Sequence, residues 1–253
     1  MHRINSKRTK KLVRLNSKIL VGYLLAGYKD KDNFNESLSL LEGSSIGILE
    51  IGFPSKNPYA DGEIIANAHK MVNYEEATSI EYWRTIRKST NKVIWLMAYY
   101  KDFIENKKYV QFVEEGLIDG LVIPDTDIET RIKLQKEIKQ YKVDVIGFVN
   151  PLMEKEEINQ VLDNFVLIYE QLYVGQTGKS QTKEVYHEML KITCEHGKTV
   201  PFAGFGINSY ASVKKVLNEG FRGAIIGTEI IKRINQSSES LQNLLNDINK
   251  AVE

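Results

Sequence analysis

Two carboxylates flank a short loop early in the chain, and their spacing suits acid/base chemistry. Glu50 is embedded in the apolar run 47–51, and Asp61 follows eleven residues later, after a loop punctuated by glycine and proline. An ionised glutamate in a buried strand is costly to desolvate without a partner or a function. At the carboxyl end of a strand, Glu50 could project into a pocket that suits proton transfer, with Asp61 returning to face it. The structural alternative pairs Glu50 with a lysine or backbone amides and makes Asp61 the cap of a helix that begins near Glu63.

The elements that would position these side chains are short apolar runs separated by longer amphipathic segments. The runs lack strict alternation, which is typical of strands buried on both faces of a parallel sheet. Strands are expected over 19–26, 46–51, 93–98, 120–123, 143–149, 165–169, 200–203 and 223–226. Helices are expected over 31–41, 102–115, 129–140, 184–196, 211–217 and 241–252. The alternation of strands and helices predicts the α/β class and a (β/α)8 TIM barrel, with a doubly wound open sheet as the alternative.

Bulk composition is that of an ordinary globular protein. The 253 residues are 42% hydrophobic and 26% charged with a net charge of +1, which gives no global case for a nucleic-acid partner. The single cysteine, Cys194, excludes an internal disulfide and is expected to be buried on its helix. We expect a basic, partly disordered N-terminal leader over 1–17 and one barrel domain over 18–253.

The N-terminus resembles a signal peptide only superficially. The apolar run 19–26 follows several basic residues, but Lys29, Asp30 and Lys31 come directly after it, and no apolar run is long enough to span a bilayer. We therefore expect a cytoplasmic protein with no membrane partner.

Glycine-rich turns follow the last two predicted strands, where barrels commonly bind phosphate. Gly204, Phe205 and Gly206 follow one strand, and Gly227 and Thr228 follow the other, before a helix expected to begin near residue 229. Glycines allow close backbone approach, and free N–H groups at a helix start favour an anion. Together these turns predict a phosphate site.

The segment 173–180 has the closing letters of a nucleotide-binding P-loop but not its opening glycine. Tyr173 occupies that first position, where the tight turn around the phosphates needs glycine. A mobile lid that completes a phosphate site is the better interpretation. No histidine follows a predicted strand, and no metal-ligand cluster is evident, so we expect cofactor-free acid/base chemistry and no metal.

Several segments, in order, resemble the tryptophan synthase alpha subunit family. The loop from Leu49 to Gly62 is similar to the family's Leu-Glu-x-Gly-x-Pro and Pro-Leu-Ala-Asp-Gly motifs, and the segment 96–100 resembles its Leu-Met-x-Tyr-Tyr. The strand end 120–125, the lid 175–178 and the two glycine turns are similar as well. The resemblance runs from the first predicted strand to the last helix.

The resemblance implies a lyase that cleaves indole-3-glycerol phosphate by a retro-aldol reaction to indole and glyceraldehyde 3-phosphate, in tryptophan biosynthesis or a related indole-producing pathway. By position, Glu50 would shuttle protons, and Asp61 would hold the indole N–H and stabilise the positive charge on the ring. The implied substrate-binding residues are Tyr23, Tyr99, Tyr169, Gly178, Phe205, Gly206, Gly227 and Thr228. Tyr23 and Tyr99 could also be core aromatics, and Thr228 could be only a helix cap.

Departures from the family pattern gather where its alpha subunit meets a beta subunit. They include Ser55, Lys56, Asn57, Lys101 and Asp127, with further changes at Gly22, Thr126, Tyr173 and Gln176. Because the carboxylates and glycine turns are retained, we expect the pocket chemistry to survive while the contact with a tryptophan synthase beta subunit is altered. The alternatives are a non-catalytic or regulatory barrel that binds a synthase partner, and a lyase for another phosphorylated substrate, which the bulky Tyr59 and Tyr173 would favour.

Overall fold

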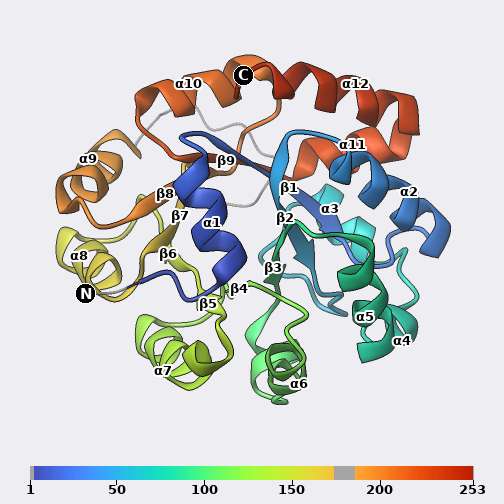
Figure 1. Ribbon diagram of the computed structural model, residues 1–253, viewed down its shortest axis with the longest axis horizontal. Helices are drawn as coiled ribbons and strands as arrows, with labels where there is room; N and C mark the ends of the chain where they lie inside the picture. The colour runs from blue at the N-terminus through green and yellow to red at the C-terminus, as the bar shows by residue number, and fades with distance from the viewer. Residues whose placement is uncertain (1–2, 174–185, 253) are drawn as a thin grey trace.

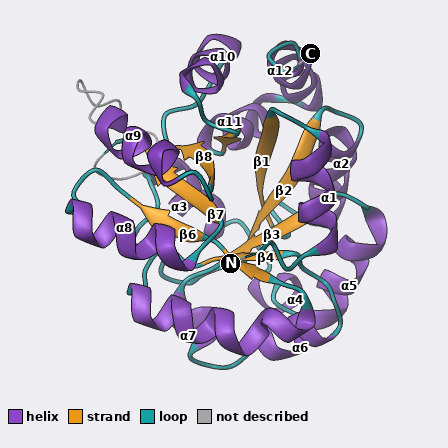
Figure 2. Cartoon of the chain, turned by 60° about the vertical axis from the view of Figure 1, so that its left-hand side comes forward, coloured by secondary structure: helices purple, strands orange, loops and turns teal. Residues whose placement is uncertain are grey.

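Parallel strands form the centre of the molecule and helices surround them (Figures 1 and 2). The computed structural model describes residues 3–173 and 186–252. The strands are β1 Ile19–Leu25, β2 Ile46–Gly52, β3 Val93–Met97, β4 Gly120–Val122, β5 Asp144–Val145, β6 Gly147–Val149, β7 Leu167–Gln171, β8 Val200–Gly204 and β9 Gly223–Ile226. Neighbours pair in the order β5-β4-β3-β2-β1-β9-β8-β7-β6, and every pair is parallel.

The sheet closes on itself through one interrupted strand. β5 and β6 are two halves of the strand predicted over 143–149, separated by Ile146. β5 pairs with β4 and β6 pairs with β7, while the Ile146 N–H still donates to the Leu121 carbonyl at 2.9 Å. The (β/α)8 TIM barrel is therefore confirmed, and the open-sheet alternative is wrong.

Helices connect successive strands on the outside of the barrel. They are α2 Lys31–Glu42, α3 Glu63–His69, α4 Tyr74–Ala77, α5 Ile80–Ser89, η1 Tyr100–Ile104, α6 Tyr109–Glu114, α7 Ile128–Ile138, η2 Lys139–Tyr141, α8 Lys155–Asn164, α9 Tyr186–His196, α10 Tyr210–Glu219, α11 Thr228–Gln236 and α12 Ser238–Asn249. The single helix predicted over 102–115 is wrong: a π-helical turn and α6 share that segment, because Lys107 between them adopts a left-handed φ of 53°.

Alternate residues of each strand face two different apolar layers. Ile48 on β2 packs inside the barrel, where Trp95 and Phe202 meet edge to face with ring centroids 4.8 Å apart. Leu49 and Ile51 face outward into the layer between the sheet and the helices. This alternation sends the side chain of residue 50 into the barrel interior.

Helix α1, Lys7–Leu15, lies across the barrel in Figure 1 and covers the end where the strands begin. Leu12 is within contact range of a Cβ built on Gly47, near the start of β2. The Ser6 N–H donates to Asp144 at 2.9 Å and the Ser6 hydroxyl donates to Asp119 at 2.9 Å. The segment 1–17 was expected to be partly disordered, but its residues 7–15 form a helix. That helix is anchored because Ser6, the residue before it, donates hydrogen bonds to buried carboxylates at the starts of the strands.

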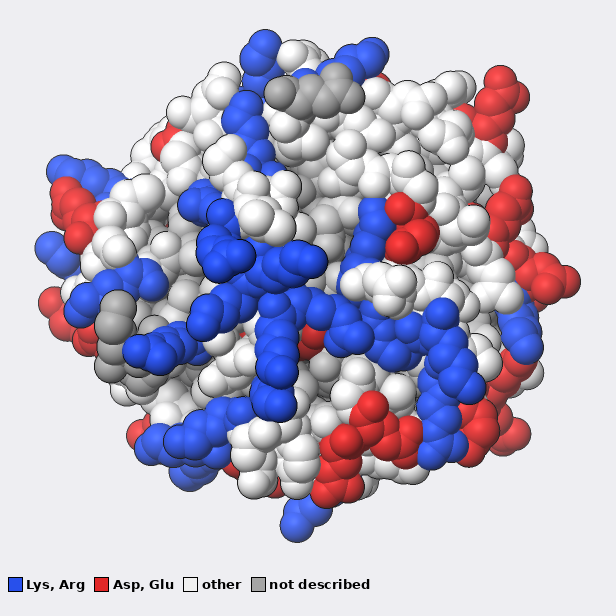
Figure 3. All heavy atoms as spheres, in the orientation of Figure 1, with Lys and Arg blue, Asp and Glu red and all other residues white. Residues whose placement is uncertain are grey.

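The outer face of α1 is strongly basic. Its exposed basic side chains are Lys7, Arg8, Lys10, Lys11 and Arg14. Lys and Arg side chains gather on the face shown in Figure 3, which is the face that α1 covers in Figure 1. In the described part of the chain, every helix is too short or too polar to cross a membrane.

Cys194 differs from expectation because it is exposed on α9. The buried face of that helix consists of Tyr186, Met189, Leu190 and Thr193, and residue 194 falls beside this stripe.

Candidate active site

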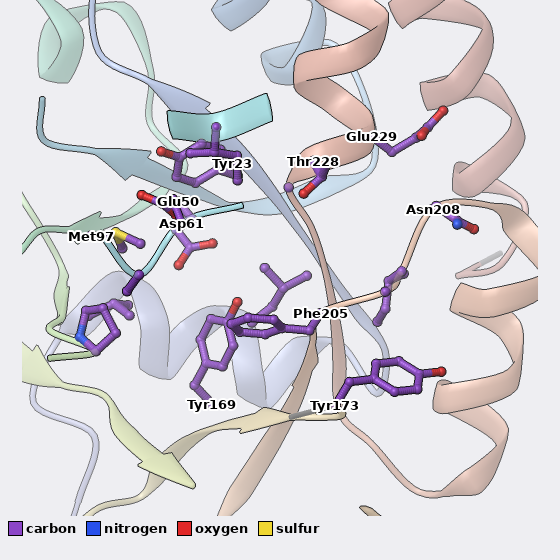
Figure 4. Close-up of a pocket in the computed structure, with 18 of the residues that line it drawn as sticks. Tyr23, Glu50, Asp61, Met97, Tyr169, Tyr173, Phe205, Asn208, Thr228 and Glu229 are labelled. Atoms are coloured by element: carbon purple, nitrogen blue, oxygen red, sulfur yellow. The ribbon is translucent and has the colours of Figure 1, made fainter. Parts of the chain in front are cut away.

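A cavity of about 240 Å³ opens where the strands end, on the side opposite α1. Its walls come from several strand ends and the loops that follow them, as expected for the ligand site of a barrel. The residues discussed below that line it are Tyr23, Glu50, Asp61, Tyr169, Tyr173, Phe205, Gly206, Asn208, Gly227, Thr228 and Lys232. Figure 4 shows most of these side chains around the cavity.

Glu50 projects into this cavity from β2. Strand register places it between Tyr23 on β1 and Trp95 on β3, and its side chain is buried. Burial, and then the negative charge of Asp61, raise the pKa of Glu50 from 4.5 to about 8. Both effects oppose ionisation, whereas the lysine partner of the structural alternative would favour it. A carboxyl in this state can donate a proton at neutral pH.

Asp61 returns to the cavity from the loop after β2, as the spacing predicts. Its Oδ2 accepts a hydrogen bond from the Tyr99 hydroxyl at 2.8 Å, and that hydroxyl accepts one from the Ala60 N–H at 3.2 Å. Gly62 is the N-cap of α3 and Asp61 lies outside the cap position, so the helix-cap alternative is wrong. The loop therefore holds a buried carboxylate beside Glu50 (Figure 4).

Two further tyrosines line the cavity, and strand glycines make room for them. A Cβ on Gly52 would lie 2.4 Å from the hydroxyl oxygen of Tyr23, and one on Gly204 would lie 2.1 Å from the Tyr169 ring. Burial first, and then the nearby carboxylates, raise the pKa of both tyrosine hydroxyls. Tyr99 lies behind Asp61 rather than in the cavity wall, so it acts on the site through that carboxylate.

The glycine turns form the other side of the cavity (Figure 4). Phe205 and Gly206 have consecutive left-handed φ values of 72° and 78°, and the Phe205 ring meets Tyr169 edge to face at 6.2 Å. Gly227 is the N-cap of α11 and Thr228 is its first residue. The first N–H groups of a helix have no partner within the helix, so the start of a helix is a favourable place for an anion.

Several expectations about the loops have mixed outcomes. Tyr173 lines the cavity, whereas Tyr59 is 56% exposed and its hydroxyl donates to Asp125 at 2.8 Å. Tyr59 therefore does not reduce the space for a ligand. Gly178 and the predicted lid 175–178 lie outside the described residues.

The residues where the family pattern changes lie in different environments. Ser55 is buried, while Lys56 is exposed with its ammonium 4.7 Å from the centre of the Tyr74 ring. Asn57 and Lys101 are also exposed. Asp127 is the N-cap of α7 and accepts a hydrogen bond from Thr130 N–H at 2.7 Å. Ser55 is thus unavailable to a partner, and the others remain at the surface.

Three functional candidates were not evident from the sequence. Asn208 and Lys232 line the glycine side of the cavity, and Lys232 lies on α11, one turn after its first residue. His69 lies on α3 with its Nε2 3.5 Å from Asp61 Oδ2, although the sequence indicates no histidine near the site. Within the described residues, no group of three or more His, Cys, Asp or Glu side chains is arranged to hold a metal ion.

Fold and cavity define a (β/α)8 barrel with a buried carboxyl pair facing two glycine turns and the start of a helix. A family model described as tryptophan synthase alpha chain matches residues 9–253. The tryptophan synthase alpha chains of Petrotoga mobilis and Campylobacter jejuni subsp. doylei are 29% and 30% identical, over 93% and 90% of this chain and 93% and 92% of theirs.

Solved structures agree with these matches. A structure of Mycobacterium tuberculosis tryptophan synthase has a TM-score of 0.86 at 19% identity, with 98% of both chains covered. Tryptophan synthase subunit alpha from Campylobacter jejuni has a TM-score of 0.78 at 26% identity, over 92% of this chain and 96% of that chain. The chain belongs to the tryptophan synthase alpha chain family, whose members are lyases of tryptophan biosynthesis.

Proposed function

We propose that the chain cleaves indole-3-glycerol phosphate by a retro-aldol reaction, releasing indole and glyceraldehyde 3-phosphate. The observation that carries this proposal is the placement of Glu50 and Asp61 in one cavity, opposite the glycine turns and the start of α11. A phosphate at those turns would direct the indole ring of the substrate toward the two carboxyls.

Glu50 supplies the proton transfers. With its pKa raised to about 8, it holds a proton at neutral pH and donates that proton to C3 of the indole ring. The resulting carboxylate then accepts the proton of the glycerol hydroxyl as the carbon–carbon bond breaks. The bonding electrons return to the ring, so indole and an aldehyde form and Glu50 is protonated again. Proton transfers alone balance the reaction, which therefore needs no redox cofactor.

Asp61 stabilises the ring while it is positively charged. Protonation at C3 places positive charge on the indole nitrogen, and a carboxylate that accepts a hydrogen bond from the indole N–H favours this state over the neutral ring. Tyr99 holds Oδ2 of Asp61 at 2.8 Å, which leaves Oδ1 for the indole N–H. The two carboxyls thus have different roles.

The phosphate is held mainly by backbone N–H groups. Phe205, Gly206 and Thr228 line the cavity and would supply these groups. Lys232 brings a positive charge to the same wall, where it also pairs with Glu229 at 3.7 Å. Gly178 remains a predicted contact outside the described residues. Tyr23 and Tyr169 provide the aromatic wall for the indole ring.

A tryptophan synthase beta subunit is the proposed protein partner. The exposed residues Lys56, Asn57 and Lys101, together with Asp127 at the start of α7, would form a contact surface that differs from the family pattern. These changes would alter the coupling to the partner without altering the cavity.

The test is release of indole from indole-3-glycerol phosphate by the purified chain, with and without a beta subunit. We expect release, with a partner increasing its rate. Absence of indole in both conditions would contradict the proposal and favour a non-catalytic barrel. A thermal-shift comparison of phosphorylated compounds tests whether the substrate is a compound other than indole-3-glycerol phosphate, because the true ligand should stabilise the folded chain most strongly.

A further inference from the structure

His69 lies between the loop after β2 and the carboxylate of Asp61. Its side chain is only 2% exposed, on the buried face of α3 beside Ile65 and Ala68. The N–H of Ser55 donates to its Nδ1 at 2.9 Å. Its Nε2 is 3.5 Å from Asp61 Oδ2 and has no hydrogen-bond partner among the described residues.

The Ser55 contact fixes which ring nitrogen carries the proton. Because Nδ1 accepts the Ser55 N–H, the neutral ring must carry its proton on Nε2. A buried N–H of this kind needs an acceptor, and the nearest charged group is the Asp61 carboxylate. A contraction of a few tenths of an ångström completes that hydrogen bond, as catalytic contacts often tighten only with substrate bound.

We propose that His69 is a positioning residue for Asp61: with Tyr99, it holds Oδ2 from behind so that Oδ1 faces the nitrogen of the substrate ring. The inference rests on the proposed function, since it assigns Asp61 to the charged ring. A neutral donor suits this role because it orients the carboxylate and leaves its negative charge available. A lysine in the same place would neutralise the negative charge of Asp61, which is the charge that stabilises the positive indole ring.

The two ring nitrogens of His69 allow its structural and positioning roles to be separated. In His69→Asn, the side-chain oxygen can still accept the Ser55 N–H, but no atom reaches Asp61. In His69→Gln, the side-chain N–H can reach Asp61, but the acceptor at the Nδ1 position is lost. His196→Gln is the matched control, because His196 also pairs with an aspartate, Asp163, at 3.1 Å, far from the cavity walls.

Indole release is measured for the wild type and the three variants, with thermal unfolding in parallel. We expect His69→Asn to lower kcat by about tenfold or more, with KM and unfolding temperature nearly unchanged, because the lost contact strengthens as charge develops on the ring. His69→Gln should retain most of kcat, and His196→Gln should match the wild type. Equal kcat for His69→Asn and the wild type would overturn the inference. The inference would also be overturned if both His69 variants lost activity in proportion to their loss of stability.

A second measurement does not depend on the reaction. Nitrogen NMR of the His69 ring should show the Nε2–H tautomer, and Asp61→Asn should shift that N–H resonance. An Nδ1–H tautomer, or no response to Asp61→Asn, would overturn the positioning role even in an active enzyme. If the wild type releases no indole but the NMR result holds, the proposed function fails while the contact between His69 and Asp61 stands.

Discussion

The raised pKa of Glu50 predicts how catalysis depends on pH. Burial and the charge of Asp61 raise this pKa from 4.5 to about 8, a change equivalent to about 5 kcal/mol in favour of the protonated carboxyl. Near pH 7 roughly nine in ten free enzyme molecules then hold the proton that C3 of the indole ring must receive. Above pH 8, kcat/KM should fall about tenfold for each further pH unit.

The assay is initial indole release at low substrate concentration between pH 7 and pH 9.5, where roughly nine-tenths or more of the substrate phosphate is dianionic. The infrared band of a protonated carboxyl should disappear over the same range as catalysis declines. Glu50→Gln identifies the part of that band that belongs to Glu50. A flat profile of kcat/KM across this range in an active enzyme would refute the reasoning, as would a Glu50 carboxyl that titrates near pH 4.5.

The raised pKa of Glu50 should also make the free energy of unfolding depend on pH, in a direction that can be worked out. The native state holds the Glu50 proton to a higher pH than the unfolded chain does, so it binds more protons between about pH 4.5 and pH 8. The free energy of unfolding must therefore fall as pH rises through that window, by up to ~1.4 kcal/mol per pH unit from this residue alone. Glu50→Gln should flatten that part of the stability profile.

Three other predictions concern the barrel and the anion site. Burial raises the pKa of Glu170 to about 7, so Glu170→Leu should raise the free energy of unfolding at pH 8 by up to about 3 kcal/mol, with little gain at pH 4, as measured by denaturant titration. Gly204→Ala should displace the Tyr169 ring, costing about 1–3 kcal/mol of stability and lowering kcat/KM, whereas Gly43→Ala, whose Cβ would make only ordinary van der Waals contacts at 3.6 and 3.8 Å, serves as a near-neutral control. Lys232→Met should raise KM for the phosphorylated substrate less than about tenfold and leave kcat unchanged, an effect that kinetics at low and high salt should show to weaken with salt.

The barrel was predictable because its strands are encoded locally. Runs such as 46–51 and 223–226 are apolar on both faces, and the structure has strands Ile46–Gly52 and Gly223–Ile226 there. The break at Ile146 was not predictable, because it separates the residues that pair with β4 from those that pair with β7, and that pairing is set by the neighbouring strands and not by the local sequence. Helices α5 and α8 were not among the predicted helices, although each has a readable start signal: a Ser79 cap for α5 and a Glu154 capping box for α8.

The site was predictable where one loop creates it and unpredictable where separate elements meet. Glu50 and Asp61 are joined by a single loop after a strand, so their common destination follows from the fold. The position of His69 depends on how α3 packs against that loop, and no pattern in the local sequence predicts the contact between His69 and Ser55. Tyr59 and Tyr173 have equal bulk, yet only Tyr173 reaches the cavity, because a partner on another loop, Asp125, holds Tyr59 outside.

The most direct test of the account compares two buried glutamates with raised pKa values. Glu50 on β2 faces the cavity, while Glu170 is buried on β7, with β1, β9 and β8 between the two strands, and does not line the cavity. Indole release from indole-3-glycerol phosphate should fall at least about 100-fold in Glu50→Gln and remain near wild type in Glu170→Gln, with binding of a phosphorylated analogue retained in both. Turnover by Glu50→Gln at the wild-type rate would contradict the assignment of proton transfer to Glu50.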